Sequence, residues 1–303
     1  SAFTDPLLGA LEISRVRLTT AYMFGTIASS LVLPFAGRAY DRFGARFLAL
    51  CSCLGLGAIL LILSAADRVA HGTAALMPAM NPGLVAAGVM TAGFFLLRFF
   101  GQGVLTMSSK NMLMQWFERR RGLANGCMGI FVALGFSLAP RILDDLIRRV
   151  GWDGAWRLLA AGIGIGGALL VLVFFRDQPE GCGLLPDGHS QDGADEENGP
   201  VRRAHRQFTL AEARATLSFW VFCVSLALLG LYYTAFTFHV ASIFSESGMT
   251  REQAFAVFLP ASVIAVSVNF FAGWISDKVP LKYLLMVMLA GTAVSLCGVI
   301  LLS

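Results

Sequence analysis

Long apolar stretches separated by short charged segments dominate this chain. Eight stretches each hold about 20 mostly apolar residues, the length that an α-helix needs to cross the hydrocarbon core of a bilayer. They cover residues 17–36, 45–65, 84–108, 122–142, 156–175, 217–240, 253–275 and 281–302. Each must be helical, because an open strand in lipid would leave backbone N–H and C=O groups without hydrogen bonds. The pattern therefore predicts an all-α integral membrane protein.

The composition agrees with this prediction. Of the 303 residues, 56% are hydrophobic and only 14% are charged, whereas a soluble domain carries about 25% charged residues. At the depth of the predicted spans, the sequence has no paired carboxylates, no metal-ligand cluster and no nucleophile beside a base. We therefore expect a protein that is not an enzyme, with no catalytic residue, no metal and no cofactor.

Lysine and arginine are concentrated in alternate loops. Three fall in loop 37–46, four in loop 109–121 and two in loop 276–282, and only one in each of 66–83 and 241–252. Loop 143–155 departs from the pattern, with two arginines among three aspartates. Positively charged loops stay in the cytoplasm, so we place the first three loops there. Span 17–36 then runs from outside to inside, and we expect FTDPL, near the start of the chain, to end a preceding helix.

A long polar connection divides the spans into five and three. It covers residues 176–216, and its central part, 186–207, reads as a flexible cytoplasmic linker with an acidic block before a basic one. A solvated tether and a regulatory or lipid-contacting segment both fit this composition. Thr209 and Glu212 have the spacing of a capping box, which predicts a short helix there. The predicted domains are an incomplete N-terminal half-bundle (1–175), the linker (176–216) and an incomplete C-terminal half-bundle (217–303).

Two loops repeat one pattern of residues. GRAYDRFGAR (37–46) and GWISDKVPLK (273–282) share G-x-x-x-D-[RK]-x-x-x-[RK], and each loop joins two spans on the cytoplasmic side. Topology alone accounts for the positive charges, but it does not require glycine and aspartate at one spacing in both halves. Two membrane halves with matching loops and a soluble linker are typical of transporters built from parallel repeats.

With these loops, the chain resembles the major facilitator superfamily, and within it the monocarboxylate transporter-like and oxalate/formate antiporter-like group. Four further stretches carry the resemblance: RFFGQG (98–103), QWFERRRGLANG (115–126), GWDGAWR (151–157) and PEGCGLLPDG (179–188) followed by FTLAEA. The resemblance implies a helical bundle in which the eight spans correspond to the second to ninth of twelve helices. It further implies a secondary active transporter without enzymatic activity.

Arg98 and Gln102 are polar residues at membrane depth. An arginine at the centre of a span costs at least roughly 2.5–3.5 kcal/mol on insertion scales and needs a reason to be there. One reading is a cation that attracts an anionic substrate or modulates a proton-carrying group. The other is a structural arginine that ties helices together through backbone carbonyls. Gln102 follows one turn later, on the same face of an α-helix.

Span 217–240 gathers further polar groups. Tyr232 and His239 are two turns apart and share a face, and Tyr233 completes an aromatic pair that can line a cavity or mark the membrane interface. His239 can carry a proton near neutral pH, or it is a solvated residue at the outer end of its span. In the group that the chain resembles, an arginine that binds the substrate carboxylate lies four residues before the loop glycine, which is Gly273 here. Here that position is Asn269, which cannot form a charged bidentate pair.

We expect a small solute, an organic anion such as a monocarboxylate, to be moved by alternating access with proton coupling or exchange. The expected cavity residues are Arg98, Gln102, Tyr232, Tyr233, His239 and Asn269. The expected gating residues are Gly37, Arg38, Asp41, Arg42, Arg46, Glu118, Arg119, Gly273, Asp277 and Lys278, and Arg42, Glu118 and Arg119 are expected to surround Asp41. The expected partners are the substrate, a proton and the bilayer of a bacterial inner membrane. We expect a monomer that binds no nucleic acid. A receptor or scaffold that binds its ligand without transport is the alternative, and an embedded enzyme is a second one.

Overall fold

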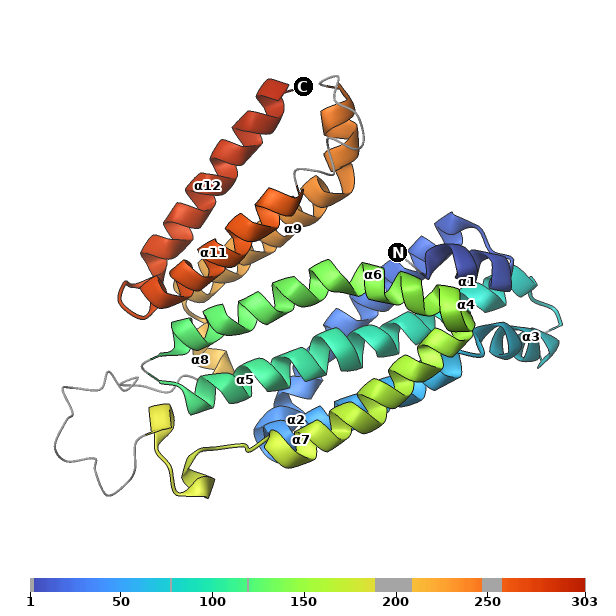
Figure 1. Cartoon of the computed structure of the whole chain (residues 1–303), viewed down its shortest axis with the longest axis horizontal. Helices are drawn as coiled ribbons and strands as arrows, with labels where there is room; N and C mark the ends of the chain where they lie inside the picture. Colours follow the sequence, from blue (N-terminus) through green and yellow to red (C-terminus); the bar gives the residue numbers. More distant parts are fainter. Residues whose placement is uncertain (1–2, 77, 119, 189–208, 247–257, 303) are drawn as a thin grey trace. The chain divides into compact units, whose positions relative to one another are not determined.

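The computed structural model describes residues 3–76, 78–118, 120–188, 209–246 and 258–302 (Figure 1). Within these ranges the regular elements are helices. Five helices there are long and apolar enough to cross a membrane, and a shorter apolar helix covers Val263–Ser276. The prediction of an all-α membrane protein is confirmed.

Two of the long helices each contain a break at a glycine. Helix α2 (Arg15–Leu63) has 49 residues, and Gly44 interrupts it with φ 81° and ψ 174°. Helix α6 (Arg121–Ala161) has 41 residues, and Gly151 interrupts it with φ 77° and ψ 168°. Glycine adopts positive φ without a steric penalty. A continuous 49-residue helix would be about 74 Å long, more than twice the hydrocarbon thickness, so α2 supplies the two predicted spans 17–36 and 45–65.

The chain forms two compact units, and the first comprises Ser1–Glu118 and Leu134–Gln191. After α1 (Thr4–Leu11) and α2, it contains α3 (Ala66–Leu76) and α4 (Pro82–Leu97), and α4 continues through the π-helix η1 (Arg98–Leu105) into α5 (Thr106–Trp116). The last part of α6 then continues through a second π-helix, η2 (Gly162–Gly167), into α7 (Ala168–Phe174). Two 3-10 turns, Glu180–Cys182 and Pro186–Gly188, end the unit's described part.

Close contacts fix the relative directions of these helices. The first part of α2 runs parallel to α4 and η1, because a Cβ added to Gly25 would lie 2.8 Å from the Phe95 nitrogen, and one added to Gly103 would lie 3.0 Å from Leu33. The second part of α2 runs the opposite way, because Leu63 lies beside Gly93 and Leu56 beside Gly101. The loops 37–46 and 109–118 therefore lie at the same end of this unit, as the charge pattern predicts.

Small residues allow α2 and η2 to approach closely. A Cβ added to Gly57 would lie 2.7 Å from the Gly164 Cα, and one added to Gly167 would lie 3.2 Å from the Cys53 sulfur. The sequence GIGIGG (162–167) resembles a nucleotide-binding loop, yet these contacts identify it as a helix-packing surface. Leu63, Met90 and Trp156 belong to the adjoining buried core.

The second unit comprises Arg119–Ala133 and Asp192–Ser303. Its described helices are the start of α6, α8 (Leu210–Arg214), α9 (Leu217–Glu246), α11 (Phe258–Ser276) and α12 (Leu281–Leu302). The predicted capping box is confirmed, since Thr209 and Glu212 exchange side-chain-to-backbone hydrogen bonds at the start of α8. The unit joins the first part of one span from before the linker to the spans after it. The division at residues 175 and 217 stays a prediction.

Candidate functional site

Arg98 connects two spans of the first unit. Its Nε donates a 3.2 Å hydrogen bond to the Thr26 hydroxyl, and its guanidinium carbon lies 5.1 Å from the centre of the Tyr22 ring. The Thr26 hydroxyl donates in turn to the Tyr22 carbonyl oxygen at 2.8 Å. Within the described part of the chain, the other four N–H donors of Arg98 have no hydrogen-bond partner. Arg98 is therefore held by one bond and retains the donors that a carboxylate binds.

The helix that carries Arg98 changes its geometry at that residue. The π-helix η1 extends from Arg98 to Leu105, where sequence reasoning expected an ordinary α-helix. The hydroxyl of Ser52, which is fully buried, donates a 2.8 Å hydrogen bond to the Phe100 carbonyl oxygen within this stretch. Gln102 is exposed and makes no hydrogen bond to Arg98. π-Helical turns occur frequently at functional sites. Sequence reasoning did not identify Ser52 as a hydrogen-bond partner of this turn.

The other predicted cavity residues belong to the second unit. The Tyr232 hydroxyl forms a hydrogen bond with the Ser295 hydroxyl and so joins α9 to α12, whereas Tyr233 is 72% exposed. Asn269 faces the start of α6, since a Cβ added to Gly129 would lie 3.7 Å from the Asn269 Cβ. The side chain of His239 lies outside the described residues. That these residues line one cavity with Arg98 stays a prediction.

Asp277 caps the first turn of α6. Its two carboxylate oxygens accept hydrogen bonds from the backbone N–H groups of Gly122, at 2.6 Å, and Leu123, at 3.0 Å. The first N–H groups of a helix have no partner within the helix, and a negative charge is favourable there. Asp277 follows the end of α11, so the predicted gating aspartate of the second loop bonds directly to a span from the other side of the linker.

Two glycines make this contact possible. A Cβ added to Gly122 would overlap with the carbonyl oxygen of Gly273, and one added to Gly273 would overlap with the carbonyl oxygen of Gly122. The Gly273 carbonyl also accepts a 2.7 Å hydrogen bond from Ser276. Beside the contact, the Lys278 ammonium lies 3.6 Å from the centre of the Trp274 ring. The glycine shared by the repeated loops is thus, in the second loop, a site of close backbone approach.

The first loop of the repeat differs. A Cβ added to Gly37 would meet no described atom within 4 Å, and Asp41 forms no hydrogen bond or ion pair with the described residues. Arg38 and Arg42 lie over the rings of Phe35 and Phe43, at 4.5 and 5.2 Å. Arg119 lies outside the described residues, and the backbone N–H of Glu118 donates to Asp187 at 3.2 Å. The charge network around Asp41 stays a prediction.

Arg46 and Asp177 make a polar contact beside this loop in the described part of the first unit. The Arg46 backbone N–H donates to the Asp177 carboxylate at 2.7 Å, and the Arg46 guanidinium donates to the Leu172 carbonyl at 2.6 Å. Burial raises the pKa of the nearby Tyr40 phenol, and the negative charges of Asp177 and Asp41 raise it further. Sequence reasoning did not identify Asp177, because no spacing connects it with a loop 131 residues earlier.

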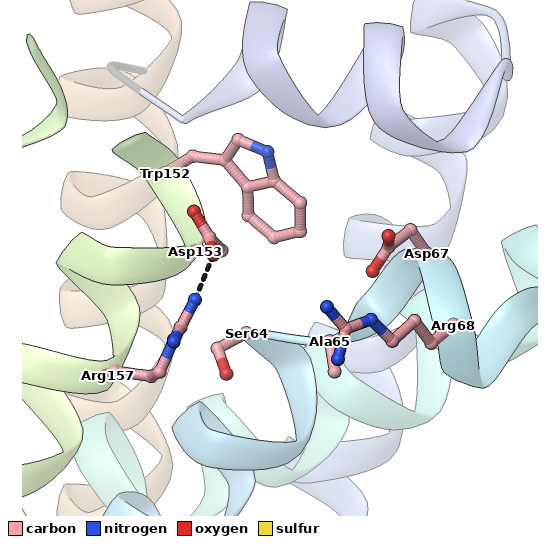
Figure 2. Close-up of a pocket in the computed structure, with 7 residues that line it drawn as sticks. All are labelled: Ser64, Ala65, Asp67, Arg68, Trp152, Asp153 and Arg157. Atoms are coloured by element: carbon pink, nitrogen blue, oxygen red, sulfur yellow. Dashed lines mark hydrogen bonds and ion pairs between the residues drawn. The ribbon is translucent and has the colours of Figure 1, made fainter. Parts of the chain in front are cut away.

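A cavity of about 320 Å³ lies at the opposite end of the first unit (Figure 2). It is lined by Ser64, Ala65, Asp67, Arg68, Trp152, Asp153 and Arg157. Asp153 pairs with Arg157, and the Gly154 backbone N–H, followed by Arg157, holds the pKa of Asp153 below its usual value. The predicted cavity residues are absent from this lining, so we do not identify it with the substrate site. In the described ranges, no three His, Cys, Asp or Glu residues are arranged to hold a metal.

The sequence of this chain is similar to those of known membrane and uncharacterized proteins. The sequence profile described as Major Facilitator Superfamily matches residues 3–303. The chain is 29% identical over 177 residues to MFS-type transporter 1 from Ophiocordyceps sp., a match that covers 56% of this chain and 31% of that protein. It is 30% identical over 186 residues to a protein from Thermoproteus tenax, named as an uncharacterized 38 kDa protein in the 23S RNA operon, covering 60% of this chain and 43% of that protein. The matches thus span less than half of each relative.

Proposed function

Because this multi-pass membrane protein belongs to the Major Facilitator Superfamily, we propose that the full-length protein is a secondary active transporter. It moves a small solute across the membrane by alternating access, in which the two halves open the central cavity to one side at a time. One observation carries this proposal: the Asp277 carboxylate caps the first turn of α6 with hydrogen bonds of 2.6 and 3.0 Å. It joins a span before the linker to a loop after it.

The chemistry of this contact suits a gate. It consists of two hydrogen bonds from exposed or half-buried groups and a close approach of two glycine backbones, without a large interlocking core of side chains. Such a contact stabilises a closed end and can be broken at a cost of a few kcal/mol, since a hydrogen bond to a charged group contributes about 1.5–3 kcal/mol at most sites and less when exposed. We assign Asp277 to the cytoplasmic gate, closed in this contact.

Arg98 supports an anionic substrate. Its guanidinium lies within a predicted span and uses one N–H donor on Thr26, and the remaining donors match the geometry of a carboxylate. We therefore propose that the solute is an organic anion such as a monocarboxylate, bound by Arg98. Asn269 then contributes a neutral hydrogen bond at the position where the monocarboxylate transporter-like group has an arginine.

The coupling and the location belong to the same proposal. Transport is coupled to a proton or to a counter-solute, with His239 as the candidate proton carrier because imidazole titrates near neutral pH. The arginine-rich loops lie in the cytoplasm of a bacterial cell, and the protein works as a monomer in the inner membrane.

The test is uptake by the full-length protein in proteoliposomes, measured with radiolabelled small carboxylates and with neutral analogues of the same size. We expect uptake of at least one carboxylate, inhibition by other carboxylates and little uptake of the analogues. Substitution Arg98→Lys keeps the charge but removes the planar donors, and should lower carboxylate uptake. Equal uptake of carboxylates and neutral analogues would overturn the anionic substrate.

A further inference from the structure

The sequence PEGCGLLPDG (179–188) has no role in the transport mechanism described so far. In the structure it belongs to a segment, residues 175–188, that follows α7 and folds on itself. The N–H groups of Cys182 and Leu184 both donate to the Pro179 carbonyl, at 2.9 and 3.1 Å, and Gly183 donates to Glu180 at 3.0 Å. Pro179 is less than 2% exposed. We call residues 175–188 the clasp.

The clasp is anchored on two loops of the first unit. At its start, the Asp177 carboxylate accepts the Arg46 backbone N–H at 2.7 Å, in loop 37–46. The Arg176 carbonyl accepts the indole N–H of Trp116 at 2.9 Å, at the end of α5. At its other end, the Asp187 carboxylate accepts the Glu118 backbone N–H at 3.2 Å. The clasp therefore joins the end of α7 to the gating loop 37–46 and to the later part of loop 109–121.

Asp177 caps the second part of α2 from a different segment of the chain. The second part of α2 begins after Gly44, whose φ of 81° breaks the helix and which has no side chain to accept the first N–H groups. Asp177 takes that role from another segment, and a Cβ added to Gly44 would lie only 2.7 Å from the Asp177 Oδ1. An acceptor and a negative charge at a helix N-terminus both stabilise the first turn. Asp277 does the same for α6 in the second unit.

Near Asp177, the hydrogen bonds from loop 37–46 to other described segments come from Arg46. Tyr40 is 7% exposed, and its hydroxyl and the Arg46 Nε are buried without a hydrogen-bond partner in the described part of the chain. Neither atom therefore supplies a hydrogen bond that holds the loop, while the Tyr40 ring packs in a buried cluster with Val104. The two bonds of Arg46, to Asp177 and to Leu172, connect the loop to the end of α7 and the residues that follow it.

We infer that Asp177 is a positioning residue of the cytoplasmic gate: through it, the clasp holds loop 37–46 in register with loop 109–121, so that both move together with α7 when the gate opens. The inference rests on the proposed transport function for its kinetic consequence. Its structural part, the cap on the second half of α2, is independent of any transported solute.

The experiment uses the full-length protein with Asp177→Ala and Asp177→Asn, and with Glu180→Ala as a matched control. Glu180 is exposed and lies in the same segment, where its side chain forms no hydrogen bond or ion pair with either loop in the described residues. Hydrogen–deuterium exchange of the peptide containing Arg46 reports the cap directly. We expect exchange at Arg46 to rise about tenfold in Asp177→Ala, the size expected for loss of a helix cap, to rise less in Asp177→Asn, and to stay unchanged in Glu180→Ala.

Uptake in proteoliposomes supplies the second readout. We expect Asp177→Ala to lower kcat at least tenfold with KM changed less than threefold, with partial rescue in Asp177→Asn. Unchanged exchange at Arg46 would overturn the cap itself. Increased exchange with normal kcat would reduce the clasp to a structural role and overturn the positioning assignment. If the wild-type protein moves no solute, the proposed function fails, while the exchange measurement still decides whether Asp177 holds the loop.

Discussion

Removal of the Asp277 carboxylate tests the proposed gate through two defined hydrogen bonds. In the structure this carboxylate accepts the N–H groups of Gly122 and Leu123, which as the first amides of α6 have no partner within the helix. Substitution Asp277→Ala deletes both acceptors and the charge while leaving the backbone of α11 intact. We expect the first turn of α6 to lose its protection and the closed gate to become less stable.

The size of the effect follows from the geometry. Loss of a helix cap costs about 0.5–2 kcal/mol, and hydrogen bonds to a charged group are worth about 1.5–3 kcal/mol each. Asp277 is exposed, so solvent screening places its contribution in the lower range, about 1–2 kcal/mol. Since 1.4 kcal/mol is a factor of ten, exchange of the two amides should become about 5- to 30-fold faster.

Hydrogen–deuterium exchange on the full-length protein in detergent or nanodiscs measures this change. A peptide that begins at least two residues before Gly122 and includes Leu123 should lose protection in Asp277→Ala. Lys278→Ala is the matched control, because Lys278 neighbours Asp277 but contacts the Trp274 ring instead of α6. It should leave the exchange of Gly122 and Leu123 unchanged.

Two results would refute the reasoning. Fast exchange of both amides in the wild-type protein would mean that the Asp277 cap is not populated. Equal exchange in the wild type and Asp277→Ala, with both slow, would mean that another group protects the first turn of α6.

Three further predictions concern the first unit. Gly44→Ala places a side chain at φ 81° and against Asp177, so thermal unfolding should occur several degrees lower, by a cost of about 1–3 kcal/mol. Gly37→Ala adds a side chain in open space within a helix and should leave the unfolding temperature unchanged or raise it slightly, because alanine is the better helix former; equal values in the two variants would contradict the geometry. Arg98→Lys should lower carboxylate uptake at least tenfold with normal expression and thermal stability, and normal uptake would remove the guanidinium from the substrate site. The raised pKa of Tyr40 favours the protonated phenol in the folded state, so its contribution to stability should be present below pH about 10, the unfolded value, and lost as the pH rises through the folded pKa; unfolding of the wild type and Tyr40→Phe should diverge above pH 10 and not below it.

The helical spans could be predicted because hydrophobic length alone determines them. A run of about 20 apolar residues must be helical in lipid, so the spans within α2 and α6 could be identified although each helix is continuous apart from one glycine. The capping box at Thr209 is equally local and was also predictable. The π-helix at Arg98 was not, because RFFGQG contains no residue type that requires a π-turn, and Ser52, which bonds to it, is 48 residues away from Phe100.

The contact of Asp277 with α6 was predictable in part. The repeat identified Asp277 and Gly273, because a shared spacing in two halves is visible in the sequence. Their partner Gly122 was not identified, because it lies 155 residues before Asp277 in the sequence. The same limit hid Asp177, whose bond to Arg46 spans 131 residues. Long-range pairs of this kind depend on how the helices pack, and single-sequence patterns report only local spacing.

The central claim is that the full-length protein transports its solute. The most direct measurement is accumulation of a radiolabelled carboxylate in proteoliposomes under an imposed pH gradient or with a counter-solute inside. The account predicts accumulation above the external concentration, with a lower initial rate in Asp277→Ala. Saturable binding of the carboxylate without accumulation, under either driving force, would contradict transport and identify a receptor that binds its ligand without moving it.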